Sequence, residues 1–129
     1  MATNPVVVPN TITVHLGRPD EAAENVTVTF TDYIKNVASN EIYPTWPDSA
    51  IRANILAQIS FALNRIYTEY YRSRGYDFDI TNNTVIDQAF VKDGEIFDNI
   101  SKIVDQIFNN YIVKSGSIVP YAAKFCDGV

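Results

Sequence analysis

Two short segments near the start of the chain alternate polar and apolar residues. They are Thr11-Ile-Thr-Val-His-Leu16 and Asn25-Val-Thr-Val-Thr-Phe30, and both are rich in β-branched residues. Alternation with a period of two places every second side chain on the same face of a strand. Because Gly17-Arg-Pro-Asp20 is typical of a connecting loop, the pattern predicts a pair of short antiparallel strands.

The longest expected element is a helix from Ala50 to about Arg74. Asp48-Ser49 suits its start, and Gly75 suits its end, since glycine readily adopts the left-handed conformation found there. Its apolar residues recur every three or four positions and form a wide stripe, which predicts a helix that is central and largely buried. These residues are Ile51, Ile55, Leu56, Ile59, Phe61, Ala62, Leu63 and Ile66.

Two further helices are expected, one on each side of this long helix in the sequence. The first follows the capping residues Thr31-Asp32 and ends before the irregular turn Pro44-Thr-Trp-Pro47. The other runs from about Glu95 to Tyr111. Between Tyr76 and Asp93, the Asn, Asp and Thr residues favour strands or a structured loop. We therefore predict an α+β fold with a long central helix, two further helices and short antiparallel strands, and a strand start at Ser117-Ile-Val-Pro-Tyr121.

Length and composition fit a single domain, because 129 residues with 47% hydrophobic content are enough for one core. We expect residues 11–129 to form this domain. Residues 1–10, rich in proline and small apolar side chains, are expected to form an extended arm through which the chain could form a homo-oligomer. A net charge of -5 with scattered cations disfavours nucleic-acid binding. We expect no membrane insertion, since no apolar run reaches about 20 residues, and no signal peptide is visible.

Few residues are available for metal or cofactor chemistry. With one histidine, His15, and one cysteine, Cys126, the chain cannot form an internal disulfide or a His/Cys metal cluster. The five glycines are isolated, so no phosphate-binding loop is expected. We therefore predict no metal and no cofactor, and interpret His15 as a partly buried strand residue. Cys126 could be a free thiol, a crosslinking site or half of a pair whose partner lies beyond the terminus.

Among the carboxylates, Glu41 has the most distinctive surroundings. It lies between a helix end and a proline-stiffened loop that carries Tyr43 and Trp46. An apolar, aromatic environment favours the protonated carboxyl group, which a proton donor needs, and a tryptophan can stack on a sugar ring. The alternative is a surface glutamate at a helix terminus beside a tryptophan that packs on the long helix. The residues alone favour this alternative.

A second acidic feature is the alternating pair Asp77 and Asp79. Such a pair could bind a cation or supply the second carboxylate of a glycosidase, although the polar face of a strand is the more common explanation.

The stretch from Tyr33 to Leu63 resembles the central motif of the stage II sporulation protein D family. That motif has a tyrosine-led short helix, a glutamate, a Trp-Pro turn, and a helix with an Ala-Leu-Lys-Ala-Gln-like start that continues to Ala-Arg-Thr-Tyr-Ala-Leu. The resemblance extends over roughly Thr11 to Val129 and includes a clostridial branch with a peptidoglycan-binding module further on. It implies a lytic transglycosylase acting on peptidoglycan glycan strands, in the cell wall or associated with the spore.

By this resemblance, Glu41 matches the catalytic glutamate of the family. It would protonate the oxygen of the MurNAc-GlcNAc bond and then accept the proton of the muramoyl C6 hydroxyl as a 1,6-anhydro ring closes. Arg52 matches the lysine of the family and would offer a cation toward the cleft. Trp46, Tyr43 and Gln88 are implied as further substrate-binding residues.

Two departures from the family pattern leave a second hypothesis open. Ile59 stands where the family has the arginine of Ala-Arg-Thr-Tyr, which argues for an altered substrate or a lost activity. The closing Ser-Gln-Tyr/Trp-Gly-Ala segment of the family does not occur before Val129, so we expect a C-terminally incomplete domain with an open cleft. The alternative to an enzyme is therefore a catalytically inactive module that binds wall glycan or serves in assembly.

Overall fold

The computed structural model describes residues 8–109 of the chain. Along the sequence the elements are β1 (Thr11–His15), β2 (Asn25–Thr29), α1 (Phe30–Glu41), α2 (Asp48–Tyr67), the 3-10 helix η1 (Arg72–Arg74), β3 (Ile80–Thr81) and α3 (Asp98–Ile107). The expected strand start at 117–121, Cys126 and most of the expected arm lie outside the described residues. None of the helices within 8–109 combines the length and the apolar composition needed to cross a lipid bilayer.

The sheet has three strands in the order β2-β1-β3. β1 and β2 pair antiparallel, as predicted, with Thr11 opposite Thr29 and His15 opposite Asn25. β3 pairs parallel with the end of β1, so the sheet is mixed. Two residues are too few to show a period, and the alternation of the sequence therefore did not reveal this third strand.

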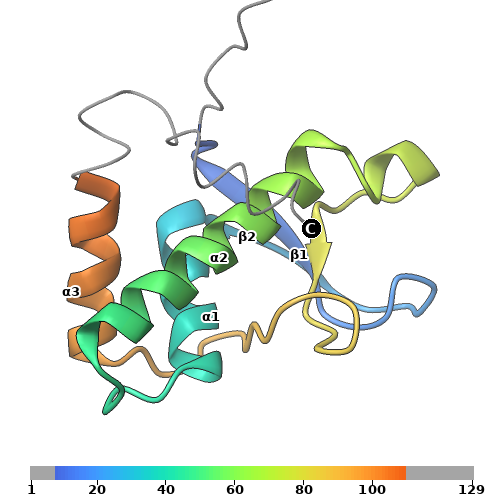
Figure 1. Ribbon diagram of the computed structural model, residues 1–129. Coiled ribbons are helices and arrows are strands. Elements are labelled where there is room, and N and C mark those ends of the chain that lie inside the picture. Colours follow the sequence, from blue (N-terminus) through green and yellow to red (C-terminus); the bar gives the residue numbers. More distant parts are fainter. Residues whose placement is uncertain (1–7, 110–129) are drawn as a thin grey trace, which may run out of the picture.

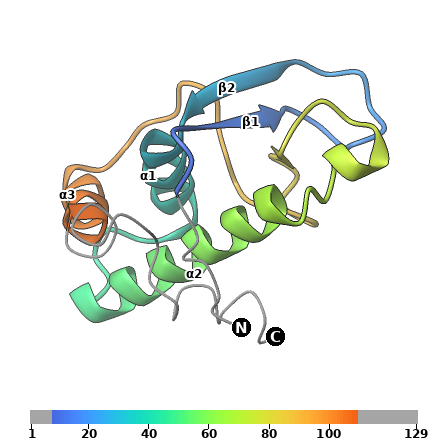
Figure 2. The same ribbon diagram turned by 90° about the horizontal axis from the view of Figure 1, so that it is seen from above.

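α1 lies between the sheet and α2, and α3 packs beside it (Figures 1 and 2). The helix begins directly after β2, where the Thr29 hydroxyl caps it by accepting a hydrogen bond from the Asp32 N–H at 3.1 Å. Most of α1 is buried, including polar positions among the apolar ones. Its buried residues are Phe30, Tyr33, Ile34, Asn36, Val37, Ala38 and Ser39.

α2, the longest helix of the described residues, begins at Asp48, two residues before the predicted Ala50, and ends at Tyr67 instead of near Arg74. The chain leaves the helix because Glu69 adopts a left-handed backbone conformation with a φ of 51°. This turn lets Tyr71, which is 3% exposed, point back into the protein. The end of α2 therefore depends on tertiary contacts that its apolar period does not contain.

The regular part of α3 runs from Asp98, three residues after the predicted start at Glu95, to Ile107, and the predicted end at Tyr111 lies outside the described residues. Its buried face matches the predicted helical spacing and consists of Ile100, Ile103, Val104 and Ile107. Within residues 8–109, three α-helices and a small sheet around one hydrophobic core confirm the α+β class.

Asp87 connects several of these elements from within the loop that follows β3. Its side chain is fully buried and accepts hydrogen bonds from Arg65 Nε at 2.7 Å and the Tyr71 hydroxyl at 2.5 Å. It also accepts from the N–H and hydroxyl of Thr81 at 3.1 and 2.6 Å. Burial and the bond to Asp87 raise the pKa of Tyr71 above its ordinary value, so this phenol remains a donor.

Replacing Asp87 with alanine tests this connection. Asp87→Ala leaves Arg65 without its buried partner, and we expect the free energy of unfolding to fall by about 3–5 kcal/mol. Chemical denaturation measures the change. The control is Glu24→Ala, which removes an exposed pair with Lys92 and should change stability by less than about 1 kcal/mol. Equal effects of the two variants would contradict the role of Asp87.

Candidate functional site

Glu41 is the last residue of α1 and is exposed at the start of the turn into α2. Within the turn, the Trp46 N–H donates to the Tyr43 carbonyl at 3.1 Å. The Pro44 carbonyl accepts a hydrogen bond from the Asn99 side chain of α3 at 2.8 Å. The turn is therefore fixed from inside and by a neighbouring helix.

Two N–H groups hold the Glu41 carboxylate. Gln58 Nε2 of α2 donates to Oε1 at 3.1 Å, and the backbone N–H of Ala89 donates to Oε2 at 2.8 Å. The two donors lie on different elements, α2 and the segment after Asp87, so the orientation of the carboxylate is fixed from two sides.

Glu41 completes a row of polar side chains on α1, which we call the polar stripe: Tyr33, Asn36, Asn40 and Glu41. The stripe binds the segment 88–91 along its length. Asn36 accepts from the Val91 N–H at 2.9 Å and donates to the Val91 carbonyl at 2.7 Å, as a neighbouring strand would. Asn40 Nδ2 donates to the Ala89 carbonyl at 3.0 Å. The polar stripe therefore places the segment 88–91 against α1.

Gln88, implied as a substrate-binding residue, lies inside this contact and is 5% exposed. Its Oε1 accepts from the Tyr33 hydroxyl at 2.7 Å, and its Nε2 donates to the Gln58 carbonyl at 3.1 Å. Burial, followed by the charges of Asp87 and Glu41, raises the pKa of Tyr33 well above its ordinary value, so its hydroxyl stays protonated. Gln88 thus connects α1 with α2 through Tyr33 and through Gln58, the residue that also binds Glu41.

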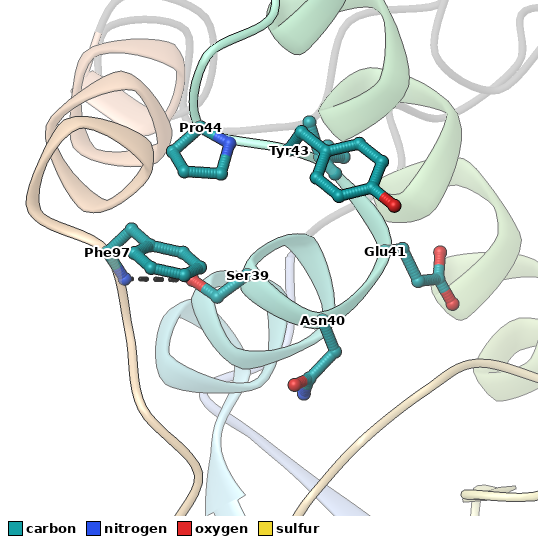
Figure 3. A pocket seen from close by; sticks show the side chains of 7 residues that line it. Ser39, Asn40, Glu41, Tyr43, Pro44 and Phe97 are labelled. Carbon is teal, nitrogen blue, oxygen red and sulfur yellow. Dashed lines mark hydrogen bonds between the residues drawn. The ribbon is translucent and has the colours of Figure 1, made fainter.

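Tyr43 and Trp46 form an exposed aromatic pair beside Glu41. Their side chains are 69% and 38% exposed, and their ring centroids lie 5.9 Å apart at an angle of 58°. Next to them is a pocket of about 280 Å³. Its lining residues are Ser39, Asn40, Glu41, Ile42, Tyr43, Pro44 and Phe97. In Figure 3, Tyr43 and Glu41 lie on one side of this region and Phe97 on the other.

The structure places Arg52 away from this group. Its guanidinium pairs with Asp48 at 2.5 Å and donates to the Gln106 side chain of α3. Arg52 therefore connects the start of α2 to α3, and among the described residues no contact joins it to Glu41. Ile59, at the position of the family arginine, is fully buried in the core.

Gln58 is the site residue that sequence reasoning missed. It is 7% exposed and occupies a place on the apolar face of α2, between Ile55 and Ala62. A polar residue within a buried stripe needs hydrogen-bond partners, and this interruption was the available signal.

The second acidic feature is structural. Asp79 accepts from the Thr13 N–H and from Arg72 Nε, each at 2.8 Å, and this pairing raises the pKa of Arg72. His15 is 5% exposed, as expected for a strand residue. Its ring stacks on Phe78 with a centroid distance of 4.4 Å. Asp79 and His15 therefore both contribute to the packing around β1.

The family model described as "Stage II sporulation protein" matches residues 20–112, which is more than half of the chain and includes all three α-helices. The chain belongs to the stage II sporulation protein D family. No curated protein and no solved structure matches the sequence. Membership of the stage II sporulation protein D family associates the chain with sporulation and the cell wall.

The contact between the polar stripe and the segment 88–91 can be tested at Asn36. Asn36→Ala removes both bonds to Val91, so we expect unfolding free energy to fall by about 1–3 kcal/mol. The amides of Ala89 and Val91 should exchange with solvent faster, as measured by NMR.

The matched control is Asn54→Ala, which removes one bond from an exposed asparagine to the Ala50 carbonyl. We expect this change to leave the exchange of both amides as it is. Unchanged exchange in Asn36→Ala would show that the stripe does not hold the segment.

Proposed function

We propose that this member of the stage II sporulation protein D family is a lytic transglycosylase that cleaves the MurNAc-GlcNAc bond of peptidoglycan, with Glu41 as its general acid and base. The supporting observation is the setting of Glu41. It is an exposed residue that lines a pocket, and both oxygens of its carboxylate are held by N–H donors. Access and a fixed orientation are what proton transfer to a bound substrate requires.

The proposed reaction needs one carboxyl group. Protonated Glu41 gives its proton to the glycosidic oxygen as the bond from that oxygen to C1 of the muramoyl residue breaks. The resulting carboxylate then takes the proton of the C6 hydroxyl while the C6 oxygen bonds to C1 and closes the 1,6-anhydro ring. One proton is given and one is returned, so no water is consumed. A second carboxylate at glycosidase spacing is not required.

Tyr43 and Trp46 are proposed to bind the glycan. Their exposed rings offer apolar faces on which sugar rings can stack, next to the carboxyl group that acts on the bond. Arg52 and Gln88 are proposed to contribute through the helices: the half-exposed Arg52 joins the start of α2 to α3, and the buried Gln88 joins α2 to α1. Substrate contact and site geometry are thus assigned to different residues.

A second candidate function is a catalytically inactive module that binds wall glycan or serves in assembly. Two observations favour it. Glu41 also fastens the segment 88–91 through the Ala89 N–H, so a structural role alone could account for it. In addition, Ile59 replaces the family arginine and lies in the core. This candidate predicts binding to peptidoglycan without cleavage.

Glu41→Gln separates the two functions. Denuded glycan strands are incubated with each protein, and anhydro-muramoyl ends are counted by mass spectrometry. Because the amide cannot transfer the proton, we expect the rate to fall by about 10²-fold or more. Glu95→Gln, at an exposed glutamate outside the pocket lining, should keep the wild-type rate. No product from the wild type, or equal product from Glu41→Gln, would contradict the enzymatic function.

Trp46→Ala tests the aromatic pair. Loss of the ring should lower the affinity for purified peptidoglycan about fivefold to tenfold, since an aromatic contact contributes about 1 kcal/mol beyond its buried area. Co-sedimentation of the protein with peptidoglycan measures this affinity. The control is Tyr67→Ala, which removes another exposed ring, at the far end of α2. If both variants bind like the wild type, the pair is not the glycan surface.

A further inference from the structure

Gln58 has an unusual hydrogen-bond pattern for a buried side chain. Its Nε2 donates to Glu41 Oε1 at 3.1 Å. Its Oε1 is buried and has no hydrogen-bond partner within the described residues. Buried amide oxygens are nearly always paired, and an unpaired one destabilises the fold, so this side chain calls for an explanation.

The shape of the amide group offers an explanation for the unpaired oxygen of Gln58. Half a turn about the last side-chain bond exchanges the NH₂ group and the oxygen with almost no change of shape. A charged Glu41 only accepts hydrogen bonds, so it requires Nε2 of Gln58. A protonated Glu41 has an O–H to donate, and Oε1 of Gln58 can accept it after the half turn. Each orientation makes one hydrogen bond to Glu41 and leaves one amide group unpaired in the same buried place, so the number of hydrogen bonds favours neither.

We propose that Gln58 is the positioning residue of Glu41 and that its amide makes this half turn whenever Glu41 gains or loses its proton. Glu41 is then held in the acid step and in the base step. In the acid step the glycosidic oxygen replaces Gln58 Oε1 as the acceptor of the Glu41 O–H and takes its proton, and Nε2 of Gln58 then turns to donate to the new carboxylate. When the C6 hydroxyl returns a proton, Oε1 turns back. The catalytic meaning rests on the proposed function, whereas the coupling of the two side chains does not.

Hydrogen bonds hold the groups on either side of the Gln58 amide. Ala89 N–H holds Glu41 Oε2, and Gln88 holds the backbone carbonyl of Gln58. The charged or titratable groups nearest to this pair within α1, α2 and the loop 82–97 do not change their charge near neutral pH. Tyr33 of α1 stays neutral because its pKa is raised, and Asp87 of the loop is paired with Arg65 of α2. The part of the pocket formed by Phe97 and the turn adds no formal charge near neutral pH. Protonation of Glu41 is therefore the event that Gln58 follows.

The coupling is tested by NMR on the complete ¹⁵N-labelled chain. The Gln58 side-chain NH₂ resonances are followed from neutral to acidic pH. We expect one transition in which these protons lose a hydrogen bond and move upfield, and we expect Glu41→Gln to abolish it. The NH₂ group of Gln106, whose oxygen accepts from Arg52, reports whether the fold persists. A Gln58 signal that ignores pH while Gln106 stays native, or a transition that survives in Glu41→Gln, would overturn the proposal.

Kinetics test the positioning role. Gln58→Met keeps the approximate volume without hydrogen bonds, and we expect kcat for anhydro-product formation to fall about tenfold or more with little change in KM. Gln58→Glu can share a proton with Glu41, so its activity should survive only at acidic pH. Wild-type rates in both variants would refute positioning while leaving the proposed function intact. If the wild type forms no product, the proposed function fails, and the NMR transition still decides whether the side chains are coupled.

Discussion

No strand of the described residues pairs with the segment 88–91, and its peptide groups are instead paired by the polar stripe of α1. Buried or half-buried peptide groups need partners, and Asn36 supplies both a donor and an acceptor to Val91. Asn40 and Glu41 do the same for the carbonyl and N–H of Ala89. The geometry of the site depends on this row, because the group that ends it is the candidate catalytic carboxylate.

This arrangement joins stability and function in one residue. The bond that fastens Ala89 also fixes the direction in which Glu41 presents its oxygens. A freely rotating surface glutamate would have to be oriented during each encounter with the glycan, whereas a held one is oriented beforehand. The same bond explains why a protein that had lost the reaction would still keep the glutamate. Its retention alone therefore does not distinguish an enzyme from a binding module, and only the chemistry of the product does.

Local patterns in the sequence predicted much of the fold. Alternation identified β1 and β2, and helical spacing identified α1 and α2. The expected capping residues were wrong, because Thr31-Asp32 and Asp48-Ser49 lie inside the helices, whose N-caps are Thr29 and Pro47. The end of α2 escaped prediction because it depends on the left-handed Glu69 and on the contact between Tyr71 and Asp87, 16 residues apart. β3 lies within 76–93, where strands or a structured loop were expected, but its position and its parallel pairing were not predicted, because a two-residue strand has no pattern of its own.

The candidate site divides in the same way. Glu41, Tyr43 and Trp46 lie together because they belong to one turn. Arg52 and Gln88 were placed by resemblance, and their side chains are directed by partners that local sequence does not reveal. Arg52 donates a hydrogen bond to Gln106 of α3, and the buried Gln88 accepts one from Tyr33.

Positions 58 and 59 show how one step along a helix changes the chemistry of a site. Successive residues of an α-helix point about 100° apart, and α2 directs Ile59 into the core while Gln58 reaches Glu41. An arginine side chain in the place of Ile59 would carry a charge into that core unless it found a partner there, which is strongly unfavourable. A cation beside Glu41 would also favour the carboxylate at the expense of the acid. The neutral amide of Gln58 can bond either form, and this property suits a single carboxyl group that must first give a proton and then take one.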